Sequence, residues 1–177
     1  MCTPRWMIGG LLALALAGGA QAEAPKLGVP AGPALIKAWD ISIAPDGSGL
    51  PPGRGTVAQG ALLFQEKCAG CHGPAGVGGA ADRLTGGVGS LASPHPIKTA
   101  ASYWPFATTL FDYVRRAMPI PRPESLSNDE VYALCAYLLS VDHIVGANTT
   151  LDAVTLPKVR MPNRDGFVPL WPPHKAW

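Results

Sequence analysis

The strongest constraint on this chain is the string Cys68-Ala69-Gly70-Cys71-His72. Two cysteines separated by two residues and followed directly by histidine are typical of c-type haem attachment. The chemistry requires this spacing, because two thiols must reach the two vinyl groups at one edge of a single porphyrin. The adjacent histidine then lies under the iron and can bind it through an imidazole nitrogen. The string predicts that Cys68 and Cys71 hold one covalently attached haem c, with His72 as an axial ligand.

Two other interpretations of the cysteine pair are weaker. A thioredoxin-like redox pair belongs to a βαβ setting, and no run of Val, Ile or Thr precedes Cys68. A structural zinc site would need a second pair of ligands at short spacing. Cys135 stands alone in the sequence and cannot supply that pair.

Residues 1–22 have the pattern of a secretory signal peptide. Arg5 supplies positive charge, an apolar run too short to span a bilayer follows, and an A-x-A cleavage site ends at Ala22. An uncleaved N-terminal anchor is the alternative. We expect cleavage before Glu23 and a periplasmic location, which suits a haem that is attached outside the cytoplasm.

Composition excludes some function classes. The formal net charge is +2, and removal of the signal with Arg5 lowers it to +1, which argues against a nucleic-acid partner. No later segment is long and apolar enough to span a membrane after signal cleavage. The remaining chain of about 155 residues is expected to form one domain, and 21 Gly and 19 Pro predict many turns and few strands.

Two segments flank the region around the haem motif. Residues 23–54 form an arm rich in Pro and Gly, with turn chemistry at residues 45–49. Trp39 favours a partly ordered arm over a disordered linker. Residues 146–177 form a tail whose five prolines exclude regular structure throughout. Its apolar residues indicate packing on the domain or on a partner.

Between arm and tail, the sequence predicts helices over residues 56–67, 107–117 and 127–141. Capping boxes mark the starts of the first and the third of these helices. The first helix runs directly into the haem motif. We expect Tyr137 to meet Gly60 or Phe64 if the first and last helices cross.

Cys135 falls on the apolar face of the last helix, with Leu134 and Leu138. It is therefore expected to be a small buried hydrophobe, with a disulfide or an intermolecular bridge as the alternative.

Met118 is the candidate for the second axial ligand. It lies in a loop between two helices and is followed by three prolines, which can hold a thioether against iron. Histidine with methionine raises the haem potential and closes the iron to substrates. The competing residues after the motif are Met161, His95, His143 and His174.

The glycine-rich loop 73–93 is expected to wrap the histidine side of the haem. A backbone carbonyl of this loop should accept a hydrogen bond from the His72 ring and so fix its orientation. Pro74 and residues 81–84 are the candidates, and the sequence does not choose between them.

Tyr103 and Trp104 carry hydrogen-bond donors on apolar rings, which suit a buried haem propionate. Plain core packing explains them equally well. Arg115 and Arg116 could pair with propionates. Solvated positions at a helix C-terminus are the favoured interpretation for both arginines.

A helix that enters C-x-x-C-H, a methionine in a Pro-rich loop and a closing helix with an aromatic residue resemble class I cytochrome c. The resemblance implies an all-α fold, a small class I cytochrome c domain at residues 55–145, with the Pro/Gly-rich arm and the tail extending from it. It also implies that Cys68 and Cys71 hold the haem and that His72 and Met118 bind its iron.

A closer resemblance covers nearly the whole chain after the signal. The strings Ala-Trp-Asp-Ile at 38–41, Pro-Asp-Gly-Ser-Gly-Leu-Pro at 45–51, Ser-Tyr-Trp-Pro at 102–105, Asp-Tyr-Val-Arg-Arg-Ala-Met-Pro at 112–119 and Pro-Lys-Val-Arg-Met-Pro-Asn-Arg-Asp-Gly-Phe at 157–167 look like the SoxD-like cytochromes of sulfane and sulfite dehydrogenases. This resemblance implies a partner subunit with a molybdenum cofactor, which oxidises sulfur held on a carrier protein. A downstream acceptor, such as another cytochrome, would take the electrons onward. Some members carry a second haem domain, whereas this chain has one C-x-x-C-H.

We therefore expect an electron-transfer subunit of an oxidoreductase, not catalytic alone, that takes part in sulfur oxidation. One alternative is a freely diffusing carrier for another periplasmic dehydrogenase. The other is a haem enzyme or ligand sensor, which would need an open sixth iron site.

Overall fold

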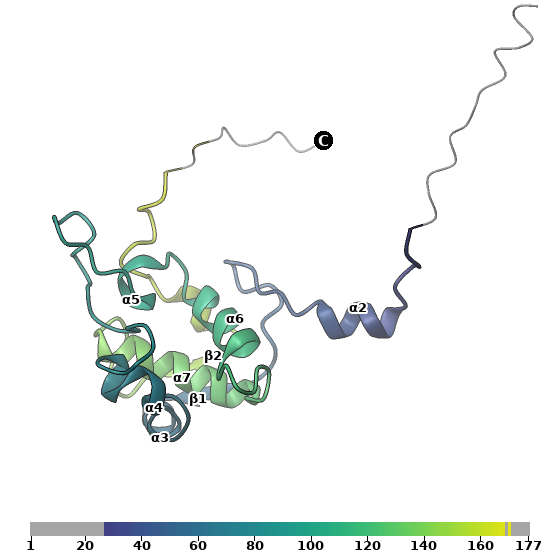
Figure 1. Ribbon diagram of the computed structural model, residues 1–177, viewed down its shortest axis with the longest axis horizontal. Coiled ribbons are helices and arrows are strands. Elements are labelled where there is room, and N and C mark those ends of the chain that lie inside the picture. Colours follow the sequence, from purple (N-terminus) through teal and green to yellow (C-terminus); the bar gives the residue numbers. More distant parts are fainter. Residues whose placement is uncertain (1–26, 169, 171–177) are drawn as a thin grey trace, which may run out of the picture. The chain divides into compact units, whose positions relative to one another are not determined.

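The computed structural model describes residues 27–168 and residue 170, which form two compact units that divide between Trp39 and Asp40. The first unit contains α2 (Pro33–Trp39), of which no residue is buried. The expected signal peptide lies outside the described residues. The second unit holds β1 (Arg54–Thr56), α3 (Val57–Lys67), α4 (Ala69–His72), η1 (Pro74–Gly76), α5 (Ala100–Tyr103), α6 (Ala107–Ala117), α7 (Asn128–Val141), β2 (Thr150–Asp152) and η2 (Leu156–Lys158) (Figure 1).

The three expected helices are present as α3, α6 and α7. At the start of α3, the Gln59 N–H donates to Thr56 Oγ1 at 3.2 Å, and the Thr56 N–H donates to Gln59 Oε1 at 2.9 Å. At the start of α7, the Glu130 N–H donates to Ser127 Oγ at 3.3 Å. These reciprocal bonds satisfy N–H groups that a helix leaves unpaired at its first turn, which explains why both helices begin where they do.

The first and last of these helices pack closely together. A Cβ on Gly60 of α3 would overlap the carbonyl oxygen of Ala133 in α7, so glycine is required for this backbone approach. One turn later, the rings of Phe64 and Tyr137 lie 5.3 Å apart between centroids. The expectation that Tyr137 meets Gly60 or Phe64 is confirmed.

The apolar core lies along α7, on which both α3 and α6 pack. α6 contributes Leu110, Phe111 and Val114, and the Phe111 ring lies 4.5 Å from that of Tyr132 on α7. Cys135 is completely buried in this core and forms no disulfide. The expectation of a small buried hydrophobe at this position is confirmed.

The all-α expectation holds, with one addition. β1 and β2 form a two-stranded antiparallel sheet in which Gly55 pairs with Leu151. This pairing brings the tail back to the domain, and the tail residues Leu151, Leu156 and Met161 are buried in the core. The tail therefore packs on the domain as far as Met161 and beyond.

The second half of the expected arm lies in the same unit as the helices. Ile43 and Leu50 pack against the core, and the Ser48 N–H donates to Asp46 Oδ1 at 2.8 Å within the expected turn. Among the helices that the structure describes, none has the length and apolar character needed to cross a membrane.

Candidate functional site

The two cysteines of the haem motif lie within one turn of each other. Cys68 ends α3 with its N–H bonded to the carbonyl of Phe64 at 2.9 Å, and it also begins α4. The Cys71 N–H donates back to the Cys68 carbonyl at 3.1 Å. Neither thiol is in a disulfide; Cys68 is half-buried and Cys71 is exposed. The continuous path from α3 into α4 thus presents two free thiols beside His72.

The environment of Cys68 does not suit a thioredoxin-like pair. Burial raises the pKa of the Cys68 thiol to about 11, an effect that the nearby charge of Lys67 opposes. Redox-active C-x-x-C pairs instead depend on a thiol whose pKa is lowered. The raised pKa of Cys68 is therefore a further argument against the thioredoxin-like interpretation of the cysteine pair.

The ring of His72 is held by the glycine-rich loop. Its Nδ1 lies 2.7 Å from the carbonyl oxygen of Asp82. A carbonyl oxygen can only accept, so Nδ1 carries a proton, and in the neutral imidazole Nε2 then has the lone pair that can bind a metal. The predicted loop carbonyl is therefore Asp82, which lies within the candidate stretch 81–84.

The loop is shaped to bring Asp82 back to the motif. The Ala81 N–H donates to the Cys71 carbonyl at 2.8 Å. A Cβ on Gly79 would overlap the same carbonyl, so this crossing of two chain segments needs glycine. The backbone thus returns to His72 within ten residues, and the Asp82 carbonyl fixes the orientation of the imidazole ring.

The two candidate methionines have different surroundings. Met118 ends α6, where its N–H bonds to the Val114 carbonyl at 3.1 Å, and its side chain is half-buried at the edge of the core. Met161 is only 1% exposed and lies inside the core. His95 and His143 are exposed, and His174 lies outside the described residues. Met161 is therefore enclosed by packing, whereas Met118 is only partly buried, and its predicted role as the second axial ligand stays a prediction.

Tyr103 and Trp104 point to different neighbours. The Trp104 ring packs edge-on against Tyr113 of α6, with 5.5 Å between centroids. The Tyr103 ring lies 5.2 Å from that of Phe167 in the tail. The structure therefore places Trp104 against the core and Tyr103 beneath the tail, and their predicted contact with propionates stays a prediction.

The sequence analysis did not predict that the tail contacts residues 103–106. Asn163 Nδ2 donates to the Tyr103 carbonyl at 2.7 Å, and the Arg164 guanidinium lies 4.3 Å from the centre of the Phe106 ring. The signal available in the sequence was the polar string Asn163-Arg164-Asp165, which lies between the apolar residues Met161 and Phe167. Three tail residues, Asn163, Arg164 and Phe167, thus contact residues 103–106, directly before α6.

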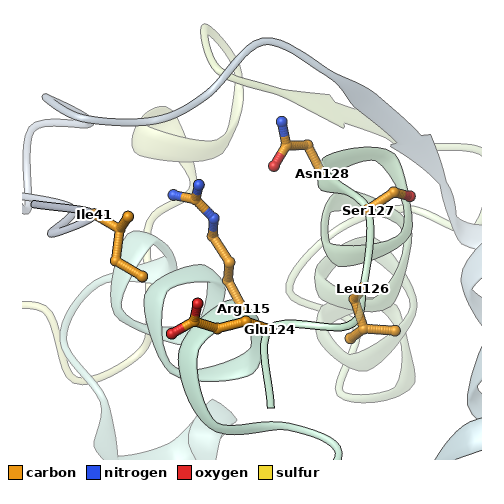
Figure 2. Close-up of a pocket in the computed structure, with 6 residues that line it drawn as sticks. All are labelled: Ile41, Arg115, Glu124, Leu126, Ser127 and Asn128. Carbon is orange, nitrogen blue, oxygen red and sulfur yellow. The ribbon is translucent and has the colours of Figure 1, made fainter. Parts of the chain in front are cut away.

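The two arginines of α6 have different surroundings. Arg116 forms an ion pair with Asp112 one turn earlier, at 2.8 Å between Nη2 and Oδ1. Arg115 points into a pocket of about 350 Å³ beside Glu124, as Figure 2 shows. This pocket is lined by Ile41, Arg115, Glu124, Leu126, Ser127 and Asn128. None of the predicted haem residues lines it.

The residues at α4 fit a covalently attached haem. Two unbridged thiols lie one turn apart, and the neighbouring imidazole has a fixed proton on Nδ1. Within the described residues, no group of three or more His, Cys, Asp or Glu side chains is placed to hold a metal ion. The donor set at α4 is one imidazole and two thiols, which fits covalent attachment of a haem with the histidine as a ligand to its iron.

The chain is similar to known proteins over most of its length. Residues 55–138 match the family model described as "Cytochrome C oxidase, cbb3-type, subunit III". The chain is 43% identical to a chain of the crystal structure of the sulfane dehydrogenase SoxCD from Paracoccus pantotrophus. That alignment has a TM-score of 0.76 and covers 82% of this chain and 72% of the other. A search of curated proteins found no match.

Proposed function

The chain belongs to the cytochrome c family, as a SoxD-like member, and we propose on this basis that it is the monohaem electron-transfer subunit of a periplasmic sulfane or sulfite dehydrogenase. Membership of the family implies a covalently bound haem c and a role in electron transfer. One haem, the periplasmic location, sulfur oxidation and the partner are parts of the proposal.

The observation that carries the proposal is the geometry at α4. Cys68 and Cys71 would hold the porphyrin through thioether bonds, and His72 would bind its iron through Nε2 while Asp82 holds Nδ1. Met118 would supply the second axial ligand. When bound, the haem supplies an iron that accepts and releases one electron at a time.

The protein's own residues set the conditions for that exchange. The Asp82 carbonyl orients the imidazole and raises its basicity, so that it would bind the iron more strongly. A histidine–methionine pair favours a high potential and leaves no open position for a substrate. This assignment supports an electron carrier over the alternatives of a haem enzyme or a ligand sensor.

The proposed electron donor is a subunit with a molybdenum cofactor, and the proposed acceptor is another cytochrome. Support comes from the similarity to a chain of the SoxCD structure, which is named as a sulfane dehydrogenase. The signal-like pattern of residues 1–22 supports export.

The test is reduction of the purified ferric protein by the molybdenum subunit from the same source. Sulfane sulfur on its carrier protein serves as the electron donor. We expect ferrous haem to appear in proportion to the sulfur oxidised, with no reduction when either the molybdenum subunit or the sulfur is left out. Haem that stays ferric beside an active molybdenum subunit would contradict the proposal. Rapid binding of carbon monoxide by the ferrous wild type would favour the open-site alternatives.

A further inference from the structure

The carbonyl that accepts the hydrogen bond from His72 belongs to Asp82, in the part of the glycine-rich loop that returns to the motif, residues 81–86. In this returning segment, the Leu84 N–H donates to the carbonyl of Gly76 at the end of η1, at 2.9 Å. Because the acceptor is a backbone carbonyl, changing the Asp82 side chain leaves it in place. The bond to the His72 ring depends instead on the contacts that hold the returning segment.

Thr85 holds the returning segment against η1. Its side chain is only 2% exposed, and its Oγ1 donates to the carbonyl of Ala75 at 2.7 Å. Ala75 has a φ of 52°, a left-handed conformation that is uncommon for a residue with a Cβ. Backbone strain of this kind persists where surrounding contacts hold it, and it is concentrated at functional sites. The Thr85 hydroxyl therefore fixes the returning segment to the residues that follow His72.

Two side chains from outside the glycine-rich loop hold the same segment at Gly86. Both carboxylate oxygens of Asp142 accept from the Gly86 N–H, at 2.7 Å and 3.0 Å. Thr99 Oγ1 donates to the Gly86 carbonyl at 2.7 Å. Asp142 directly follows α7, and a negative charge at the C-terminus of a helix does not stabilise that helix. The bond to Gly86 therefore accounts for this aspartate better than the helix does.

We propose that Thr85 and Asp142 are positioning residues for the haem iron. They anchor the returning segment, keep the Asp82 carbonyl on His72 Nδ1, and so lower the reduction potential of the bound haem. A carbonyl that accepts from Nδ1 raises the basicity of the imidazole, and a more basic ligand favours ferric over ferrous iron. This inference rests on the proposed role of His72 as an iron ligand and adds to it the residues that control that ligand.

The test measures two properties of haem-loaded variants: the reduction potential, and the exchange rate of the His72 Nδ1–H by NMR of the ferrous protein. Thr85→Val keeps the size of the side chain but removes its hydroxyl. It should raise the potential and speed the exchange at least about tenfold, because a segment that has lost a hydrogen bond opens more often. Thr85→Ser keeps the hydroxyl and should restore both values to those of the wild type.

Thr108→Val is the matched control. Thr108 is also buried, and its hydroxyl also donates to a backbone carbonyl, that of Pro45, at 3.4 Å. This bond lies outside the glycine-rich loop, so its loss should leave the potential and the Nδ1–H exchange unchanged, even if the unfolding midpoint falls. If Thr85 had only a structural role, the two valine variants would differ in their unfolding midpoints alone.

Asp142 needs a comparison of its own, because removal of a negative charge can itself raise a haem potential. Asp142→Asn keeps an oxygen that can accept from the Gly86 N–H, whereas Asp142→Ala keeps none. We expect Asp142→Ala to raise the potential and the exchange rate, and Asp142→Asn to stay close to the wild type. This pair of variants also decides the question if Thr85→Val does not hold its haem.

The inference is overturned if Thr85→Val or Asp142→Ala has the potential and the exchange rate of the wild type. An equal rise of the potential in Asp142→Ala and Asp142→Asn, with unchanged exchange, would also overturn it, because the charge and not the position would then be responsible. A wild-type protein that carries no covalent haem would instead remove the proposed function, and this inference with it.

Discussion

Met118 and Met161 are the same side chain in unlike surroundings, and exchanging each for alanine separates ligation from packing. Met118→Ala should lose the far-red absorption band of a sulfur–iron bond and lower the haem potential, while the haem stays attached. Met161→Ala should keep the band but lower the free energy of unfolding by about 2–5 kcal/mol, because it empties a fully buried site. Visible spectra and denaturant titrations of both variants provide the measurement. A band lost in the Met161 variant and kept in the Met118 variant would reverse the assignment.

Glu130 connects the start of α7 to the end of α3, and its charge makes this connection dependent on pH. Its pKa is lowered chiefly by the hydrogen bond from Lys67, and further by the N–H of Ser127. A carboxylate with a lowered folded-state pKa stabilises the fold above its ordinary value of 4.5, and this stabilisation is lost as the pH falls through the folded-state pKa. Glu130→Gln keeps the capping geometry but removes the charge.

We therefore expect Glu130→Gln to be less stable than the wild type by up to about 1 kcal/mol near pH 7. The difference should shrink as the pH falls below 4.5. Chemical denaturation at several pH values measures this change. Glu66→Gln removes an exposed carboxylate from α3 and serves as the control. A gap between wild type and Glu130→Gln that stays constant from pH 7 to pH 3 would show that the ion pair does not stabilise this contact.

The contact between α3 and α7 depends on one missing side chain. Gly60→Ala places a Cβ against the Ala133 carbonyl, so the two helices must separate. Overpacking of this kind lowers the free energy of unfolding by about 1–3 kcal/mol. Gly146→Ala is the control, because its Cβ would meet nothing closer than 3.7 Å. Equal thermal midpoints for the two variants would contradict the close packing of these helices.

The starts of α3 and α7 were predictable because their signals are local. Thr56 with Gln59 and Ser127 with Glu130 lie three residues apart, so the sequence alone marks where α3 and α7 begin. The strands β1 and β2 have three residues each and lie almost a hundred residues apart. No alternation of polar and apolar residues can be read in so short a segment. Their pairing depends on the tail returning to the domain, which no local pattern records.

In the candidate site, too, the features that depend on local spacing were predictable, and the contacts between distant residues were not. The spacing of Cys68, Cys71 and His72 is local and predicted the thiols and the imidazole together. The hydrogen-bond acceptor of the His72 ring could be predicted to lie in the loop but could not be assigned to Asp82. Every residue has a backbone carbonyl, so the sequence does not show which one accepts the bond. The contact of Asn163 with Tyr103 joins residues 60 positions apart and was found only in the structure.

The tail belongs to the folded domain as far as Phe167, and truncation of the whole protein tests this. A chain that ends after Phe167 should keep its haem and its unfolding midpoint, because Val168 and Leu170 are exposed. A chain that ends after Pro157 loses Met161 and the contacts of Asn163 and Phe167 with residues 103–106. We expect the shorter chain to be several kcal/mol less stable. Equal thermal midpoints for the two truncated proteins would show that residues 158–167 do not stabilise the domain.

The central claim, one haem held covalently by Cys68 and Cys71, is tested most directly by the intact mass of the denatured protein. The protein should be produced with its haem-attachment machinery and unfolded in acid before mass spectrometry. We predict the mass of a chain that begins at Glu23 plus one haem, and the bare polypeptide mass for the Cys68→Ala/Cys71→Ala variant. A bare polypeptide mass for the wild type, from a preparation that was coloured before denaturation, would contradict covalent attachment and with it the role of α4 as the haem site.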